Sequence, residues 1–126
     1  MKNVRFLICE HCKNIVQMID DKKVPVMCCG QKMVELVPNT VEASGEKHMP
    51  VPVVEEGVVK VSVGSVEHPM VPEHLIEWVY LQMENGGQIK YHSAEQAPEV
   101  KFFIGDEKPV AVYAYCNLHG LWAVEL

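Results

Sequence analysis

Four of the five cysteines in this chain lie within its first 29 residues, and their spacing restricts how that segment can fold. Cys9 and Cys12 are separated by two residues, and fifteen residues follow before the adjacent pair Cys28 and Cys29. A segment of this length buries too little apolar surface to be stable without a cross-link. The short gap lets backbone amides wrap one thiolate pair around a metal ion, and the second pair completes a tetrahedron. The spacing therefore predicts a small four-thiolate metal domain over residues 1–37.

The identity of this first metal stays open, because four thiolates suit both iron and zinc. The alternative to a redox site is a zinc ribbon, in which the ion only replaces a missing hydrophobic core. Ribbons normally end in a second pair that is two residues apart, whereas Cys28 and Cys29 are adjacent and are expected to distort the tetrahedron. His11 lies inside the first pair and is expected to be an exposed loop residue.

Residues 38–126 have a different pattern, which is typical of an antiparallel β-sheet. Alternating, β-branched segments predict strands at 51–54, 58–63, 76–83, 88–92, 100–104, 110–115 and 121–126. Turn residues separate them, as in "ENGG", "GDEK" and "NLHG". Short strands at this spacing, with no helical period between them, predict an all-β protein in which an immunoglobulin-like antiparallel sandwich follows the metal domain.

Composition excludes several classes of function. The formal charge is -6 and no run of Lys or Arg interrupts it, so we expect no binding to nucleic acid. No apolar stretch approaches the roughly 20 residues needed to cross a bilayer. The start of the chain lacks the apolar run of a signal peptide, so we expect a cytoplasmic protein whose clustered cysteines hold metal. An anionic substrate would need locally concentrated positive charge.

A second group of metal-binding side chains is spread over three motifs in the predicted sandwich. "GEKHMP" carries His48, "EHPMVPEHLIEW" carries His68 and His74, and "YCNLHGLW" carries Cys116 and His119. A closed zinc site needs only four ligands. Four imidazoles and one thiolate leave one octahedral position open, and this mixture of donors suits Fe(II). The motifs therefore predict an iron site that can react with a small molecule, with Cys116 as a ligand.

Together the motifs resemble the two-iron desulfoferrodoxin type of superoxide reductase over almost the whole chain. The spacing of the first four cysteines is similar to that of desulforedoxin, and "NTVEASGEKHMPVP", "EHPM" with "HLIEW", and "CNLHGLW" are similar to the catalytic domain of superoxide reductases. The resemblance implies a catalytic domain over residues 38–126, with four equatorial histidines and an axial Cys116. It also implies one-electron reduction of superoxide to hydrogen peroxide, two irons per chain, a homodimer and a rubredoxin-like electron donor.

Glu46 and Lys47 match the glutamate and lysine that this family has beside the open iron position. Lys47 is expected to attract the superoxide anion and to hold a water molecule that delivers a proton. Glu46 is expected to occupy the open position after the reaction. His92 belongs to none of the motifs and is expected to be structural or exposed. Trp78 and Trp122 follow ligand motifs and are expected to pack the core, where they could also form the floor of the iron site.

Two other classes of function remain as alternatives. A cysteine and a histidine near the end of a β-sandwich also occur in blue-copper electron carriers, but no methionine follows Cys116 and the histidines exceed what copper needs. A zinc-stabilised interaction module without catalysis would leave the second group of ligands unexplained.

Overall fold

The computed structural model describes residues 3–41, 43, 45–64 and 68–126, and the side chain of Glu46 is outside the described part. The chain forms two compact units, Met1–Val37 and Pro38–Leu126. Among the described residues, no helix has the length and hydropathy that a bilayer crossing requires.

The first unit is built from very short strands. Strand β1 (Phe6–Ile8) lies between β2 (Ile15–Gln17) and β5 (Val34–Glu35), and β3 (Met27–Cys28) forms a separate hairpin with β4 (Gln31–Lys32). Its core is small and consists of Leu7, Cys9 and Met33, with Met18, Val26 and Cys28 packed against them. A core of this size is consistent with a domain that needs a metal ion to be stable.

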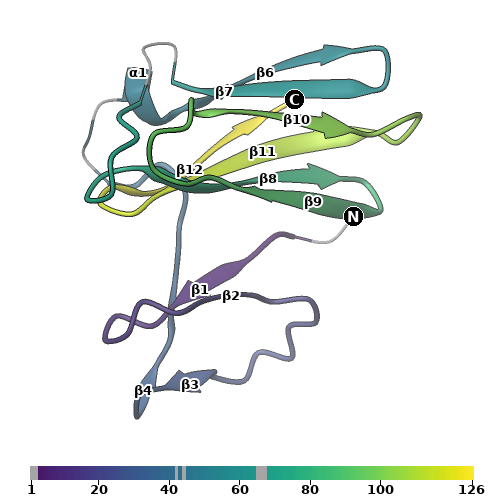
Figure 1. Cartoon of the computed structure of the whole chain (residues 1–126). Helices are drawn as coiled ribbons and strands as arrows, with labels where there is room; N and C mark the ends of the chain where they lie inside the picture. The colour runs from purple at the N-terminus through teal and green to yellow at the C-terminus, as the bar shows by residue number, and fades with distance from the viewer. Residues whose placement is uncertain (1–2, 42, 44, 65–67) are drawn as a thin grey trace. The chain divides into compact units, whose positions relative to one another are not determined.

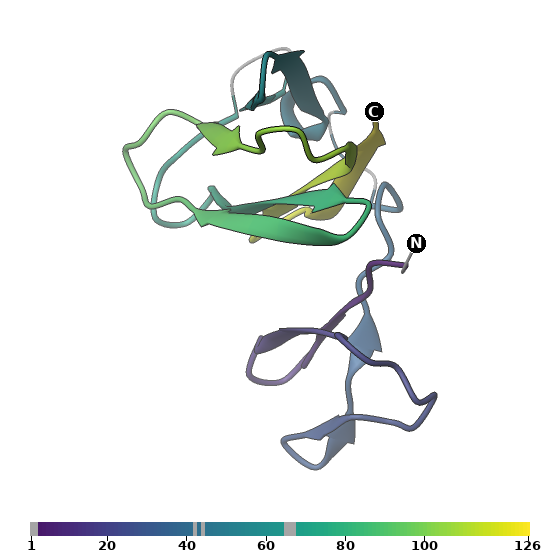
Figure 2. The same ribbon diagram turned by 90° about the vertical axis from the view of Figure 1, so that its right-hand side faces the viewer.

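The second unit is a sandwich of two antiparallel sheets (Figures 1 and 2). One sheet has the order β10-β7-β6 and the other has the order β12-β11-β8-β9. A single short helix, α1 (Gly45–His48), precedes the first strand. The strands are β6 (Pro50–Glu55), β7 (Val58–Val63), β8 (Ile76–Met83), β9 (Gly86–Tyr91), β10 (Glu99–Phe103), β11 (Pro109–Cys116) and β12 (Gly120–Glu125).

Alternation along the strands explains the core of the sandwich. Val59, Val61 and Val63 on β7 are buried, and the residues between them face outward. They pack against buried residues of the other sheet, including Ile76, Val79, Leu81, Val112 and Ala114. The β6–β7 turn needs a residue that tolerates positive φ, and Gly57 has a φ of 78° there. A Cβ atom on Gly57 would lie 3.2 Å from the carbonyl oxygen of Gly105, so the close approach of these two turns also requires glycine.

The predicted all-β fold with an antiparallel sandwich is confirmed. All seven predicted sandwich strands are present, with ends displaced by two residues or fewer. The predicted "ENGG" turn is shorter than expected, because β9 already begins at Gly86. At the other end of the same strand, His92 lies one residue beyond Tyr91 and is not part of β9. Helix α1 was not predicted, since a single turn is too short to produce a helical period. The five strands described in the first unit were not predicted either, because segments of two or three residues are too short to show an alternating pattern.

Candidate metal centres

The four clustered cysteines converge in the first unit. One sulfur from each of Cys9, Cys12, Cys28 and Cys29 lies within 4.8 Å of the others, and the Cys12 and Cys28 sulfurs are 3.6 Å apart. A tetrahedral metal site with bonds of about 2.3 Å has sulfur–sulfur edges of roughly 3.8 Å. The cluster therefore has dimensions that fit a four-thiolate ion. Cys12 and Cys29 are exposed, so one edge of the cluster faces solvent.

A tight hairpin turn lets two adjacent cysteines point to one centre. Cys28 ends β3, and the turn residues Cys29 and Gly30 both have positive φ, at 53° and 71°. Two successive residues of this kind form the turn that fits a two-residue hairpin. A non-glycine residue in this conformation costs roughly 1–2 kcal/mol. The expected difficulty of an adjacent pair thus appears as backbone strain at Cys29.

The environment of the cluster favours ionisation of one thiol. Backbone N–H groups of Cys12 and His11 donate to the Cys9 sulfur, and the bond from Cys12, at 3.5 Å, is the main reason that the pKa of Cys9 is lowered to about 6. The pKa of Cys29 is raised, mainly because its thiol shares a hydrogen bond with Cys12. A metal ion would bind the Cys9 thiolate readily and displace protons from the remaining thiols.

The second group of ligands forms a closed ring of imidazoles in the sandwich. Neighbouring rings in the order His48, His68, His74, His119 have centroids 4.6 to 5.0 Å apart and meet edge to face, at 77° to 87°. The diagonal pair, His48 and His74, is 6.2 Å apart and more nearly parallel, at 29°. Four side chains related in this way occupy the corners of a square, as equatorial ligands of one ion would.

Specific nitrogen atoms face the centre of this square. The Nε2 atoms of His68 and His74 are buried and have no hydrogen-bond partner among the residues that the structure describes. His119 contributes Nδ1, which lies 3.1 Å from Nε2 of His48. Buried polar atoms without partners are rare in folded proteins, because each one costs free energy. A metal ion at the centre would satisfy them.

A backbone contact fixes the tautomer of His68. Its Nδ1–H donates to the carbonyl oxygen of Pro69 at 2.6 Å, so Nε2 keeps its lone pair. Burial lowers the pKa of His68 to about 4, and burial also lowers the pKa of His74. Both imidazoles are therefore neutral near pH 7, which is the form that binds a metal.

Cys116 is the most deeply buried of the proposed ligands. Its side chain is fully buried, and its sulfur is 3.9 Å from Nδ1 of His119. One ligand atom from Cys116 also lies within 4.8 Å of those of His48, His68 and His74. Burial raises the pKa of the Cys116 thiol, while the backbone amides of Leu118 and His119 act in the opposite direction. These amides would stabilise a thiolate once a metal had displaced its proton.

Trp122 supports two of the histidines. Its ring stacks on His48 with centroids 5.1 Å apart, and its Nε1–H donates to the carbonyl oxygen of His119 at 3.0 Å. Trp122 is also buried, as expected, so it packs the core and lies against the histidine cluster. Trp78 does pack, since it is buried and stacks on Tyr115 at 5.5 Å.

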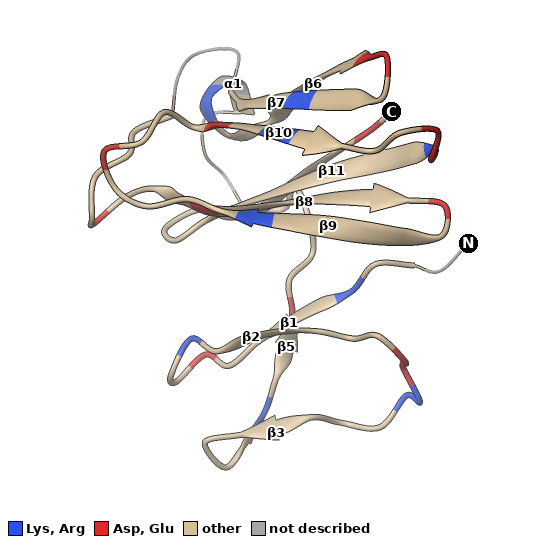
Figure 3. Ribbon diagram, turned by 45° about the vertical axis from the view of Figure 1, so that its right-hand side comes forward, with Lys and Arg blue, Asp and Glu red and all other residues tan. Residues whose placement is uncertain are grey.

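The remaining candidate residues lie around or away from the square. Lys47 is exposed on α1, where it is the only basic residue besides His48 (Figure 3), and its charge contributes to the lowered pKa of His74. The side chain of Glu46 is outside the described residues. His92 is half-buried and its Nε2 is 3.1 Å from the carbonyl oxygen of Glu99, while His11 is exposed.

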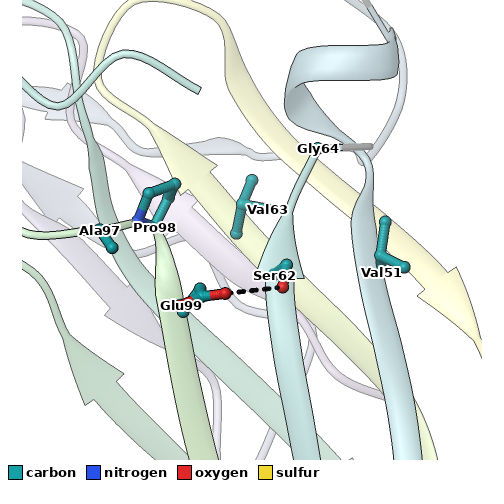
Figure 4. Close-up of a pocket in the computed structure, with 7 residues that line it drawn as sticks. All are labelled: Val51, Ser62, Val63, Gly64, Ala97, Pro98 and Glu99. Carbon is teal, nitrogen blue, oxygen red and sulfur yellow. Dashed lines mark hydrogen bonds between the residues drawn. The ribbon is translucent and has the colours of Figure 1, made fainter. Parts of the chain in front are cut away.

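A shallow pocket on the β10-β7-β6 sheet is separate from the ligand square. It has a volume of about 480 Å³, and its polar groups, Ser62 and Glu99, already bond to each other at 3.5 Å (Figure 4). It is lined by Val51, Ser62, Val63, Gly64, Ala97, Pro98 and Glu99. None of these described lining residues is a cysteine or a histidine.

Comparison with known proteins assigns the chain to a family. The Desulfoferrodoxin family model matches residues 40–125, and the chain is 41% identical over 117 residues to a desulfoferrodoxin of Desulfarculus baarsii, covering 93% of this chain and 92% of that protein. The chain belongs to the desulfoferrodoxin family. A solved superoxide reductase from Treponema pallidum superposes with a TM-score of 0.83 and 37% identity, covering 98% of this chain and 99% of that one. A one-iron superoxide reductase from Giardia intestinalis has a TM-score of 0.57 at 27% identity and covers 64% of this chain and 97% of its own.

The two donor sets fit the two-iron arrangement of desulfoferrodoxins. The first unit supplies four sulfurs at tetrahedral spacing, and the sandwich supplies four imidazoles above one buried sulfur. The sequence motifs pointed to both sets. They indicated Trp122 as a floor of the site, but they did not point to the other two supporting groups, the Pro69 carbonyl and Asn117. Each of these follows a ligand by one to three residues, and that proximity was the available signal.

Proposed function

We propose that this chain is a superoxide reductase, which reduces superoxide with one electron and two protons to hydrogen peroxide without releasing dioxygen. The observation that carries this proposal is the square of His48, His68, His74 and His119 above the buried Cys116. These five residues would hold the iron. When bound as Fe(II), the iron would supply the single electron.

Differences in burial favour one face of the square as the entrance for the substrate. Cys116, His48 and His68 are buried, whereas His74 and His119 are half-exposed. A small anion can therefore approach from the side opposite the sulfur, where no described ligand closes the site. Because the imidazoles are neutral and the thiolate carries one negative charge, a divalent ion there would leave the site with one net positive charge.

Lys47 would add to this local charge. Its exposure keeps the ammonium group in water, where it attracts anions without the cost of burial. The overall charge of -6 is screened beyond about 8–10 Å in physiological salt, so nearby cations dominate the final approach. We assign to Lys47 the steering of superoxide and the holding of a proton-delivering water, and to Glu46 a return to the open position after peroxide leaves.

Residues 1–37 are proposed as a desulforedoxin-like four-cysteine iron domain, and residues 38–126 as the catalytic domain. Cys12 and Cys29 form an exposed edge of this first site. We propose a rubredoxin-like carrier as the electron donor. A homodimer is proposed because the small core of the first unit gains stability from a partner surface.

Rapid mixing of the reduced protein with superoxide tests the proposed function. We expect one peroxide for each oxidised catalytic iron and no dioxygen from the superoxide consumed. Dioxygen at half the amount of superoxide would indicate dismutation and would refute the proposal. Metal analysis separates the other classes, since one copper would indicate an electron carrier and colourless zinc an interaction module.

A further inference from the structure

Asn117 joins the two loops that carry three of the five proposed ligands. It follows Cys116 at the end of β11 and precedes the turn that carries His119. Its side-chain Oδ1 accepts from Leu75 N–H at 2.9 Å, and its Nδ2 donates to the carbonyl oxygen of Glu73 at 3.0 Å. His74 lies between these two residues, one of which donates to Asn117 and the other of which accepts from it.

The carboxamide of Asn117 replaces a peptide group in the ladder between β11 and β8. Cys116 pairs with Ile76 after a register shift, and the backbone N–H of Asn117 then donates to the Leu75 carbonyl at 3.2 Å. In a regular antiparallel pair, Leu75 N–H would donate back to the backbone carbonyl of its partner. Here it donates to the side chain instead. The main chain can then turn away toward His119 while the ladder continues.

His74 gains most from this support because it is less buried than two of the other histidines. It is partly exposed, whereas His48 and His68 are each 2% exposed. Its backbone N–H and carbonyl are both bonded to Val71, at 3.0 and 3.1 Å. The Val71 bonds close the loop on itself, whereas the Asn117 bonds tie the residues on both sides of His74 to the end of the strand that carries Cys116.

We infer that Asn117 is a positioning residue that sets the place of His74 relative to Cys116 and His119, and that both of its side-chain bonds are needed for the site to retain its metal. The inference rests on the proposed function, in that it concerns the iron site of that reaction. Outer-layer groups of this kind typically change metal affinity by 10- to 100-fold when removed.

The test is metal retention in the full-length protein under anaerobic conditions. The parent and Asn117→Ala are loaded with Fe(II), and loss of iron to a chelator is followed by absorbance. The phase of iron loss that is missing in Cys116→Ser is assigned to the catalytic site, and the other phase to the four-cysteine site. We expect Asn117→Ala to lose that iron about 10- to 100-fold more readily and to shift the thiolate-to-iron absorption band of the oxidised protein.

Asn39 offers a matched control in the same domain. It makes the same pair of side-chain bonds, to the N–H and carbonyl of Ala123 at 2.9 and 3.0 Å, but no proposed ligand lies beside them. Glycine is the appropriate replacement because Asn39 has a φ of 62°. Asn39→Gly is expected to lower the melting temperature while iron retention and the absorption band remain those of the parent.

Two outcomes would overturn the inference. The first is an Asn117→Ala variant that keeps its iron and its band as well as Asn39→Gly does. The second, which remains informative if the alanine variant does not fold, is parent-like retention in Asn117→Asp, which keeps an acceptor for Leu75 N–H but has no donor for the Glu73 carbonyl. Retention is measured without superoxide, so a parent that holds iron but fails to reduce superoxide would refute only the proposed function.

Discussion

In the metal-free protein, His68 should make the sandwich less stable as the pH falls. Its folded pKa is about 4, compared with an ordinary value of 6.5, because burial disfavours the charged ring. The unfolded chain therefore binds a proton more readily than the folded chain between these two values. Stability contributed by the neutral ring is present above pH 6.5 and is lost as the pH falls toward 4.

The size of the effect follows from the two pKa values. Lowering the pH from about 7 to about 4.5 should cost on the order of 2.5 kcal/mol of unfolding free energy through this one group. For a domain of this size, each kcal/mol shifts the melting temperature by about 4–8 °C, so the total shift is roughly 10–20 °C. The large apolar core of the sandwich includes Cys116 but none of the four histidines, so the metal-free domain should remain folded at neutral pH.

The assay is thermal unfolding of the metal-free parent and His68→Asn across this pH range. Asparagine can still donate to the Pro69 carbonyl but has no titrating ring, so the variant should lose most of the His68 contribution to the slope of stability against pH. A cavity would lower stability at every pH without changing that slope. His11→Asn, in an exposed loop, is the control. Equal slopes in the parent and His68→Asn would refute the argument.

Three further predictions concern the metal sites. Lys47→Ala should slow the reaction with superoxide two- to fivefold at low salt and weaken its dependence on ionic strength, as expected for one charge about 5–8 Å from the anion in water. Lys60→Ala, on the exposed surface of β7, is the control and should change neither the rate nor its dependence on ionic strength. A Lys47 variant with the parent's rate and salt dependence would contradict steering. Cys116→Ser should abolish the thiolate-to-iron band of the oxidised site, and a parent-like spectrum would remove Cys116 from the ligands. Cys12→Ser should retain catalysis while sedimentation shows a weakened dimer; loss of catalysis with an intact dimer would instead indicate an electron-transfer role.

The sequence predicted the sandwich well because its strands are long enough to show alternation. In β7, buried and outward residues alternate over six positions, which is sufficient to identify the strand and its buried face. Strands of two or three residues, such as β3, show no period. They form because the cysteines and the Cys29–Gly30 turn bring together segments that are far apart in the sequence. A pattern within a few neighbouring residues cannot show such a contact.

The ligand side chains could be selected from the motifs, but their arrangement could not. Spacing indicated that His68 and His74 share a loop, yet it did not show that His119 presents Nδ1 while His68 and His74 present Nε2. That choice depends on how each ring is held by its surroundings. Likewise, the side-chain bonds of Asn117 arise because the ladder shifts register after Tyr115.

The supports of the site lie close to the ligands in the sequence, and this has a physical consequence. The Pro69 carbonyl holds His68, Asn117 holds the segment around His74, and Trp122 contacts both His48 and His119. A support that lies one to three residues from a ligand is positioned by the same turn, so little additional chain entropy is lost in placing it. The motif "CNLHGLW" therefore specifies two ligands together with the groups that orient them and His74. A substitution at Asn117, which is not part of the apolar core, should consequently change the metal site more than its effect on stability would suggest, whereas loss of a core residue such as Phe102 should lower stability with less effect on the geometry of the site.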